Sequence, residues 1–323
     1  MSVMRTGTGR RSGTAEPRPD TSPPEPGTSA PRLRRRAGDL PVAMVFLLPA
    51  AVGFAVFYLW PTLRTMYLSF TDYSLLAPPE WTGADNYRRL FGDRLFWNSL
   101  KVTVEYVVVN IGVQTIAALG MAVLMHRLTR SGLIRGVLLL PYLVANVVVA
   151  LIWYTMLDAQ LGIVNQALEW IGLDPVAFFG ETSTAIPTIA LVNVWRHVGY
   201  TALLIFAGLQ AIPKTVYEAA ATDGASEARM FWRITLPLLR PALALVLVLT
   251  VIGSFQIFDT VAVTTKGGPI NATRVIYYYI YEQAFQRFNF GYAAAICVAL
   301  FAILAGLALL QLRLLRAGDS DLD

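Results

Sequence analysis

Six long apolar stretches constrain this chain more than any other feature of its sequence. Each holds about 20 mostly apolar residues, the length that a helix needs to cross the hydrocarbon core of a bilayer. They are residues 42–63, 102–125, 137–158, 186–209, 242–263 and 292–314. Because lipid offers no hydrogen-bond partners to a backbone, only helices or closed barrels can span it. The sequence therefore predicts an all-α integral membrane protein with six transmembrane helices.

The composition favours a surface that faces lipid. Of the 323 residues, 55% are hydrophobic and 15% are charged, whereas an average soluble domain carries about 25% charged residues. A water-soluble chain with so few charges would have difficulty covering its surface. We therefore expect membrane lipid to surround most of the chain.

The distribution of Lys and Arg predicts the orientation. If the N-terminus is inside, the inner segments hold 16 basic residues and the outer segments hold 7. Inner loops normally carry this excess, and the Arg-rich run at 32–36 immediately precedes the first apolar stretch. The sequence therefore predicts that both termini are cytoplasmic. The net charge of +5 is interpreted as a signal of topology, and no nucleic-acid partner is expected.

The two ends of the chain differ from the apolar region between them. Residues 1–38 are rich in Pro, Ser, Thr, Gly and Arg, a composition that cannot bury enough surface to order itself. We expect a disordered cytoplasmic tail at 1–38, a six-helix domain at 39–316 and a short cytoplasmic tail at 317–323. Because the first apolar stretch comes late and is long, it is interpreted as an uncleaved anchor.

The loop between the fourth and fifth stretches, residues 211–237, carries the most local information. Pro213 suits the first turn of a helix, and the alanines that follow Glu218 are strong helix formers. The pair Asp223-Gly224 is a turn signal, and Ser226 can cap a second short helix. The loop therefore predicts two short helices separated by a turn, on the cytoplasmic side.

The same loop resembles the EAA loop of binding-protein-dependent ABC import permeases. That pattern is Glu-Ala-Ala, three residues, Gly, nine residues, Ile, one residue, Leu-Pro. Here the matching residues are Glu218, Ala219, Ala220, Gly224, Ile234, Leu236 and Pro237, without a gap. Segments at 207–213, 238–241, 264–269, 281–285 and 291–295 are similar to the carbohydrate branch, the relatives of the maltose and glycerol-phosphate permeases. The resemblance covers roughly residues 40–315.

This resemblance implies a type I ABC importer permease bundle in the bacterial plasma (inner) membrane. It implies four kinds of partner: a second permease subunit, two ABC ATPase subunits, an external solute-binding protein and lipid. The solute would be a sugar or oligosaccharide. The ATPase would dock on Glu218, Ala219, Ala220, Asp223 and Gly224. ATP and Mg²⁺ would lie on the ATPase subunits, with no cofactor on this chain.

Polar residues within the stretches are candidates for a solute pathway. Arg196 lies near the middle of the fourth stretch, and a charge at that depth usually faces the bundle interior or a water-filled path. The sequence leaves a functional and a structural reading open. The functional one is a pathway residue or a gating ion pair with Glu105 or Asp259; the structural one is a pair between helices, or a shorter span that leaves Arg196 near a water-accessible face. Other polar residues in the stretches have the same two readings. The candidate pathway residues are Asn193, Trp195, Arg196, Gln256 and Asp259.

The chain shows no motif of an enzyme. None of its three lysines follows a glycine, so the Gly-Lys of a phosphate-binding loop is missing. With two histidines and one cysteine, a metal site is not expected. We therefore predict a transport subunit without a catalytic site. A secondary transporter is an alternative, although such proteins more often show internal repeats. Glycerol phosphate and polyamines are alternative solutes.

Overall fold

The computed structural model describes residues 39–128 and 131–316. The predicted tails, 1–38 and 317–323, lie outside these residues. The chain divides into two units, Met1–Val56 and Phe57–Asp323, and each is described by itself. The first unit contains α1 (Asp39–Phe54), an apolar helix with Pro49 inside it.

Helices make up most of the described chain beyond α1. The π-helical turns are η1 (Ala55–Leu59), η2 (Phe231–Thr235) and η3 (Glu282–Gln286). The α-helices that precede residue 211 are α2 (Trp60–Leu68), α3 (Asp85–Gly92), α4 (Arg94–Leu128), α5 (Gly132–Leu143), α6 (Asn146–Met156), α7 (Ile163–Trp170) and α8 (Ala185–Gln210). The later α-helices are α9 (Lys214–Thr222), α10 (Glu227–Met230), α11 (Leu236–Leu238), α12 (Arg240–Phe255), α13 (Asp259–Val263), α14 (Ile276–Tyr281) and α15 (Phe290–Arg316). A two-stranded antiparallel ribbon joins β1 (Thr71–Asp72) to β2 (Glu80–Trp81).

Five segments of the described chain are long and apolar enough to cross a membrane by themselves. They are Met44–Leu68, Arg94–Arg127, Ala185–Gln210, Arg240–Val263 and Phe290–Gln311. Each overlaps one of the predicted stretches. The helical, membrane-spanning fold class is therefore confirmed.

The third predicted stretch differs from the prediction. The sequence predicts a single helix over 137–158, but the structure has two helices, α5 and α6, which meet at an angle of 87°. Val144 and Ala145 between them have extended backbone angles. Pro141 in the last turn of α5 lacks an N–H group and so weakens the helix just before the break. The count of spans reaches six only if this bent pair is one span.

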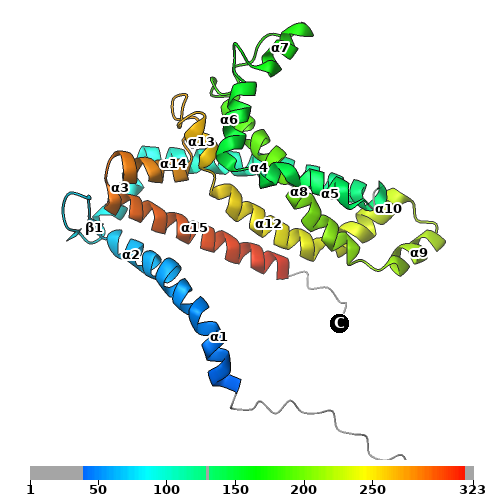
Figure 1. The fold of residues 1–323 in the computed structure, drawn as a ribbon, viewed down its shortest axis with the longest axis horizontal. Coiled ribbons are helices and arrows are strands. Elements are labelled where there is room, and N and C mark those ends of the chain that lie inside the picture. Colours follow the sequence, from blue (N-terminus) through cyan, green and yellow to red (C-terminus); the bar gives the residue numbers. More distant parts are fainter. Residues whose placement is uncertain (1–38, 129–130, 317–323) are drawn as a thin grey trace, which may run out of the picture. The chain divides into compact units, whose positions relative to one another are not determined.

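Four long helices run along the second unit (Figure 1). They are α4, α8, α12 and α15; α4 lies against α8 and α12, and α12 also contacts α15. The shorter helix α5 packs on α8 at Gly199, where a Cβ atom would come within 1.9 Å of the Leu138 carbonyl oxygen. A hydrogen atom at position 199 is therefore what allows the two backbones to approach.

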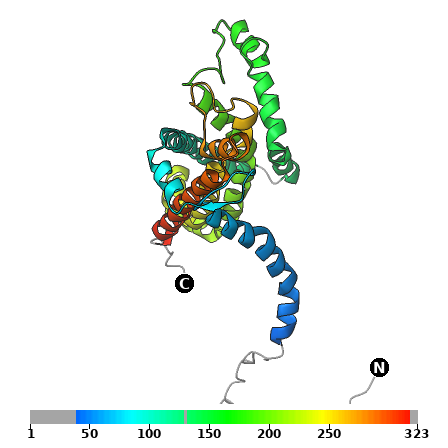
Figure 2. The same cartoon turned by 90° about the vertical axis from the view of Figure 1, so that its left-hand side faces the viewer.

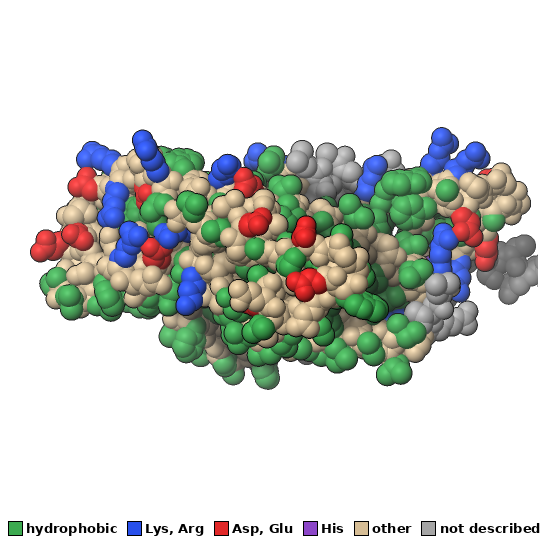
Figure 3. Space-filling view, turned by 90° about the horizontal axis from the view of Figure 1, so that it is seen from above, with side chains coloured by type: hydrophobic (Ala, Val, Ile, Leu, Met, Phe, Trp, Pro, Cys, Tyr) green, Lys and Arg blue, Asp and Glu red, His purple; other side chains and the backbone are tan. Residues whose placement is uncertain are grey.

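The helices α6 and α7 depart from this direction. Figure 2 shows them rising from one side of the second unit. Asn165 on α7 is buried and bonds to the carbonyl oxygens of Asp158 and Val176, which holds the turn around α7 together. Figure 3 shows Lys and Arg side chains gathered toward two ends of the view, over β1 and α3 on the left and over α9 and α10 on the right.

The end of the bundle that carries α3 is fixed by Asp93. Its Oδ1 accepts a hydrogen bond from the Leu95 N–H at 2.8 Å, which caps α4. Its Oδ2 accepts from the hydroxyls of Tyr279 on α14 and Tyr292 on α15, at 2.5 and 2.6 Å. Burial opposes ionisation of Asp93, but these hydrogen bonds outweigh it, so the pKa of Asp93 is lowered. Burial, together with the bond to Asp93, raises the pKa of Tyr279 to about 12.

Candidate functional site

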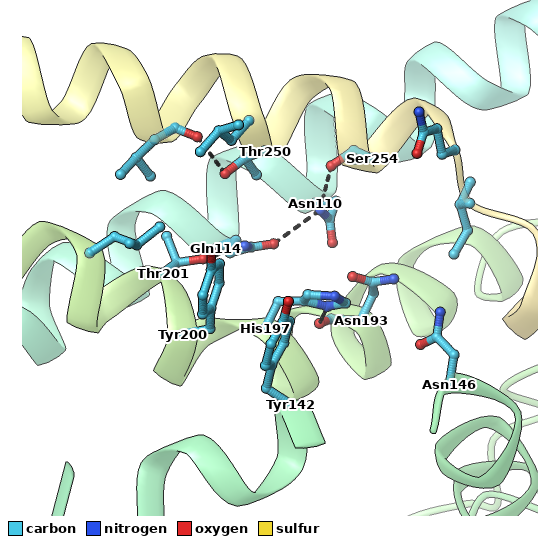
Figure 4. A pocket seen from close by; sticks show the side chains of 16 residues that line it. Asn110, Gln114, Tyr142, Asn146, Asn193, His197, Tyr200, Thr201, Thr250 and Ser254 are labelled. Atoms are coloured by element: carbon cyan, nitrogen blue, oxygen red, sulfur yellow. Dashed lines mark hydrogen bonds between the residues drawn. The ribbon is translucent and has the colours of Figure 1, made fainter. Parts of the chain in front are cut away.

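A half-open cavity lined by both polar and apolar side chains lies between helices of the bundle. Its volume is about 250 Å³, and α4, α8 and α12 line it together with the break between α5 and α6 (Figure 4). None of the described side chains that line it is an Asp, Glu, Lys or Arg. Five side-chain amides do line it: Asn110, Gln114, Asn146, Asn193 and Gln256. The cavity therefore offers hydrogen bonds without a formal charge.

A hydrogen-bonded network forms one wall of the cavity and joins three helices. Asn110 Nδ2 on α4 donates to Gln114 Oε1 at 3.2 Å and to Ser254 Oγ on α12 at 2.9 Å. Gln114 Nε2 donates to Thr201 Oγ1 on α8 at 2.8 Å. Asn110 is 1% exposed, and its Oδ1 has no partner among the described residues. This oxygen is shielded from solvent in the structure, and an unpaired buried acceptor costs about 1–3 kcal/mol.

Aromatic rings form the facing wall. Tyr142 at the end of α5 stacks on Tyr200 of α8, with 4.4 Å between ring centroids and an interplanar angle of 8°. The His197 ring meets Tyr142 edge-on at 5.6 Å. All three line the cavity (Figure 4). This wall therefore offers an apolar face beside polar groups.

Arg196 does not form either of the expected ion pairs among the described residues. Glu105 pairs instead with Lys101 at 3.5 Å, and Asp259 accepts from Asn146 at 3.0 Å. The Arg196 guanidinium bonds to backbone carbonyl oxygens at the end of α5. The structure thus supports the structural reading of Arg196 that the sequence left open.

The structure places some of the other candidate pathway residues in the cavity lining and others outside it. Asn193 and Gln256 line the cavity. Asp259 lies at the start of α13 and reaches the cavity wall only through its bond with Asn146. Trp195 is exposed on α8 and packs edge-on against Trp153, with 5.5 Å between centroids. Asn193 and Gln256 are therefore the only two of the five candidates that the described cavity includes in its lining.

Several lining residues were missing from the candidate set. Tyr142, Tyr200, Thr201 and Thr250 are the clearest. Tyr200 and Thr201 follow Asn193 by seven and eight residues, which places all three on one face of a helix. That spacing was a usable signal. Pro141, next to Tyr142, was a second signal, because a proline inside an apolar stretch weakens the helix at that point.

The loop after α8 has the predicted helix, turn and helix. α9 ends in a Schellman motif: the Ala225 N–H donates to Ala220 O and the Gly224 N–H donates to Ala221 O, both at 3.0 Å. Gly224 sits at φ +74°, the left-handed conformation that this motif requires. Ser226 caps α10 by accepting from the Arg229 N–H. Pro213 stands just before α9 rather than inside its first turn.

The five predicted coupling residues are not equivalent. Glu218, Ala219, Asp223 and Gly224 are exposed, and a Cβ added at Gly224 would meet nothing within 4 Å. Ala220 is buried, so it faces the bundle rather than solvent. Four of the five therefore form an open surface, and the fifth packs beneath it.

Side-chain bonds tie this loop to the long helices. Glu227 on α10 pairs with Arg127 near the end of α4. The Tyr217 hydroxyl on α9 bonds to Thr235 Oγ1 at 3.1 Å, just before α11. α9 follows α8 after three residues, and α11 is separated from α12 by one. The loop is therefore joined along the chain to two helices that line the cavity.

Comparison of sequences identifies related membrane proteins. Residues 114–315 match the family described as the inner membrane component of binding-protein-dependent transport systems. The chain is 32% identical over 285 residues to the sulfoquinovosyl glycerol transport system permease protein of Agrobacterium fabrum, covering 87% of this chain and 92% of that protein. It is 33% identical over 290 residues to the trehalose/maltose transport system permease protein of Thermococcus litoralis, covering 88% and 96%. It is 31% identical over 272 residues to the sn-glycerol-3-phosphate transport system permease protein of Yersinia pestis, covering 83% and 92%.

Solved structures have the same fold. A bacterial ABC transporter involved in the import of the acidic polysaccharide alginate contains a chain that superposes with a TM-score of 0.78 at 24% identity, covering 88% of this chain and 98% of that chain. The expected type I permease bundle is thereby confirmed. With the family match over most of the helices and relatives above 30% identity along nearly their whole length, this chain belongs to the inner membrane components of binding-protein-dependent transport systems.

Proposed function

We propose that this chain is the permease subunit of an ATP-driven importer for a neutral sugar or oligosaccharide. The observation that carries the proposal is the exposed, Schellman-capped helix α9, which follows α8 after three residues and is linked through α10 and α11 to α12. Those long helices line the cavity. A separate ATPase that grips α9 would thus move the cavity walls directly, and ATP hydrolysis would take place on the ATPase.

The partners follow from the same proposal. Two ATPase subunits would dock on the loops of this chain and of a second permease subunit, on the cytoplasmic side. A solute-binding protein would deliver the solute to the opposite face, where α3 and the β1–β2 ribbon lie. One similar solved structure is an alginate transporter in complex with an alginate-bound periplasmic protein, which supports a delivery partner of this kind.

The chemistry of the cavity favours a neutral, hydroxyl-bearing solute. The names of similar transporters include both charges: the trehalose/maltose permease is named for neutral sugars, whereas the glycerol-phosphate permease and the alginate transporter are named for anions. The cavity has no charged lining residue among those described. The unpaired Asn110 Oδ1 is buried in this conformation; when movement of the cavity walls exposes it, this acceptor would suit a hydroxyl donor and oppose a phosphate or carboxylate oxygen.

Docking of the ATPase tests the proposal. The chain is purified with its partner subunits in native form and as Glu218→Ala, Gly224→Asp and Thr215→Ala. Thr215 is also exposed on α9 but lies outside the Glu218–Gly224 motif, so it is the matched control. We expect the first two variants to assemble in the membrane and to lose the ATPase subunits, and Thr215→Ala to keep them. Retention of the ATPase by both motif variants would refute this coupling surface.

A further inference from the structure

The break in the third span exposes backbone groups that need partners. α5 ends at Leu143 and α6 begins at Asn146, with an angle of 87° between them. The Val144 N–H still bonds to the Pro141 carbonyl oxygen, but the carbonyl oxygens of Tyr142 and Val144 have no backbone N–H partner among the described residues. In a bundle surrounded by lipid, such groups have to be satisfied by other protein groups.

Arg196 on α8 satisfies them. Its Nη2 donates to Tyr142 O at 3.1 Å and to Val144 O at 3.1 Å, and its Nε donates to Val144 O at 3.2 Å. The planar guanidinium thus fits across the break with two of its nitrogen atoms. Its positive charge also lies at the C-terminal end of a helix, where the helix dipole favours a cation.

His197 completes this arrangement. Arg196 Nη1 lies 2.8 Å from His197 Nε2, and His197 Nδ1 lies 2.9 Å from the Asn193 carbonyl oxygen. A guanidinium only donates and a carbonyl only accepts. The imidazole is therefore neutral, with its proton on Nδ1, and it accepts from Arg196 through Nε2. All three guanidinium nitrogens are engaged.

The same contacts fix the aromatic wall of the cavity. Arg196 bonds to the backbone of Tyr142, and its guanidinium carbon lies 5.3 Å from the centre of the Tyr142 ring. That ring stacks on Tyr200. On the other side of the break, Asn146 at the start of α6 is bonded to Asp259 on α13. Hydrogen bonds from α8 therefore hold the end of α5, and a hydrogen bond to α13 holds the start of α6.

We propose that Arg196 is a positioning residue of the solute cavity, which fixes the angle between α5 and α6 and thereby holds Tyr142 against Tyr200. The role assigned to the cavity rests on the proposed function, while the role of Arg196 in setting the angle does not. Arg196 itself does not line the cavity, so it acts through Tyr142 and His197.

The angle is measured by spin labels on either side of the break. Leu133 on α5 and Ile152 on α6 are both exposed, at 78% and 49%, and are replaced by cysteine in a Cys297→Ala background. Double electron–electron resonance is recorded on the assembled transporter in nanodiscs. The variants are Arg196→Met, Arg196→Lys and, as a control, Arg88→Met. Arg88 is an exposed arginine whose ion pair is with Asp85 on α3.

We expect a narrow distance distribution in the native chain and in Arg88→Met, and a broadened, shifted one in Arg196→Met. Arg196→Lys should not restore it, because an ammonium group carries its three donors on one nitrogen atom, whereas Arg196 reaches the two carbonyl oxygens and the imidazole from three nitrogen atoms of a planar group. If Arg196→Met does not assemble with its partner subunits, the distance distribution is measured in Arg196→Lys instead. In whichever of the two variants is measured, a distance distribution like that of the native chain would overturn the inference, even if uptake were lost. Uptake without any ATPase would instead refute the proposed function and leave the distance result intact.

Discussion

The side-chain amide of Asn110 on α4 donates a hydrogen bond to the Ser254 hydroxyl on α12, with 2.9 Å between the two atoms. The residues are 144 positions apart in the chain, so the bond joins two long helices at the cavity. Only the donor side of the amide is used, and its oxygen has no described partner. One hydrogen-bond acceptor of this residue is therefore left unpaired among the described residues.

Replacing Asn110 should weaken solute binding more than it weakens folding. Hydrogen bonds between membrane helices contribute about 0.6 kcal/mol each on average, so Asn110→Leu should lower the stability only slightly. Loss of one uncharged acceptor for a solute hydroxyl should weaken affinity by roughly tenfold, corresponding to about 1.4 kcal/mol. The measurement is equilibrium binding of a panel of neutral sugars, with maltotriose as the first, to the transporter in nanodiscs.

Ser99→Ala provides the control for this prediction. Ser99 also lies on α4 and has a buried hydroxyl oxygen without a described partner, but it does not line the cavity. Its removal should leave sugar binding unchanged. Equal losses of binding in both variants would show that the effect comes from the helix as a whole, and not from the acceptor at Asn110.

Gly199→Ala should destabilise the bundle. The added methyl group would overlap the Leu138 carbonyl oxygen, 1.9 Å away, and a backbone atom cannot move aside without shifting α5. Overpacking of this kind costs about 1–3 kcal/mol or more. Gly112→Ala is the matched control, because it lies in a helix with nothing within 4 Å of the added Cβ. Thermal unfolding in detergent should show a lower midpoint for Gly199→Ala alone.

The hydrogen bonds that Asp93 accepts from Tyr279 and Tyr292 should make the stability of the protein depend on pH in both acid and alkaline solution. The pKa of Asp93 is lowered, so its contribution is present above about pH 4 and is lost as the pH falls through the folded-state value. The pKa of Tyr279 is raised to about 12, so its contribution is lost as the pH rises from about 10 toward 12. Asp93→Asn should be less stable at neutral pH and should show a flatter acid limb. If the stability of Asp93→Asn falls with decreasing pH as steeply as that of the native chain, the acid sensitivity comes from other carboxylates.

The turn after α9 should respond to side-chain shape at Gly224. A Val there has to adopt φ +74°, which costs roughly 1–2 kcal/mol for a residue with a Cβ. Asn tolerates this conformation far better. We expect ATPase affinity to fall in the order native, Gly224→Asn, Gly224→Val, as measured by titration of the purified ATPase. Native affinity in Gly224→Val would mean that the Schellman turn does not shape the docking surface.

Hydropathy predicted most of the spans, and loop chemistry predicted the turn after α9. The predicted stretch 186–209 corresponds to α8, Ala185–Gln210. α4 extends from Arg94 to Leu128, well beyond the predicted 102–125, because its start is set by the Asp93 cap rather than by apolar length. Gly224 was identified as a turn residue, and it takes the left-handed conformation of a helix C-terminus.

Pro141 marks the place where the third span breaks, but the 87° angle and the role of Arg196 were beyond what the residues alone disclose. The role of Arg196 depends on bonds between its side chain and backbone carbonyl oxygens more than 50 positions away. Every residue has such a carbonyl, so nothing in the sequence marks Tyr142 and Val144 as acceptors. For the same reason the sequence suggested carboxylates as partners of Arg196, whereas the structure shows main-chain oxygens.

The most direct test of the proposed function is solute uptake into proteoliposomes that contain the two permease subunits, with and without the ATPase subunits, with the solute-binding protein outside. Maltotriose is the first labelled sugar, followed by other neutral sugars, with glycerol phosphate and a polyamine as charged comparisons. The account predicts accumulation of a neutral sugar that requires both enclosed ATP and the ATPase, and that is lost in Gly224→Asp. Accumulation without any ATPase would contradict it and would establish a secondary transporter.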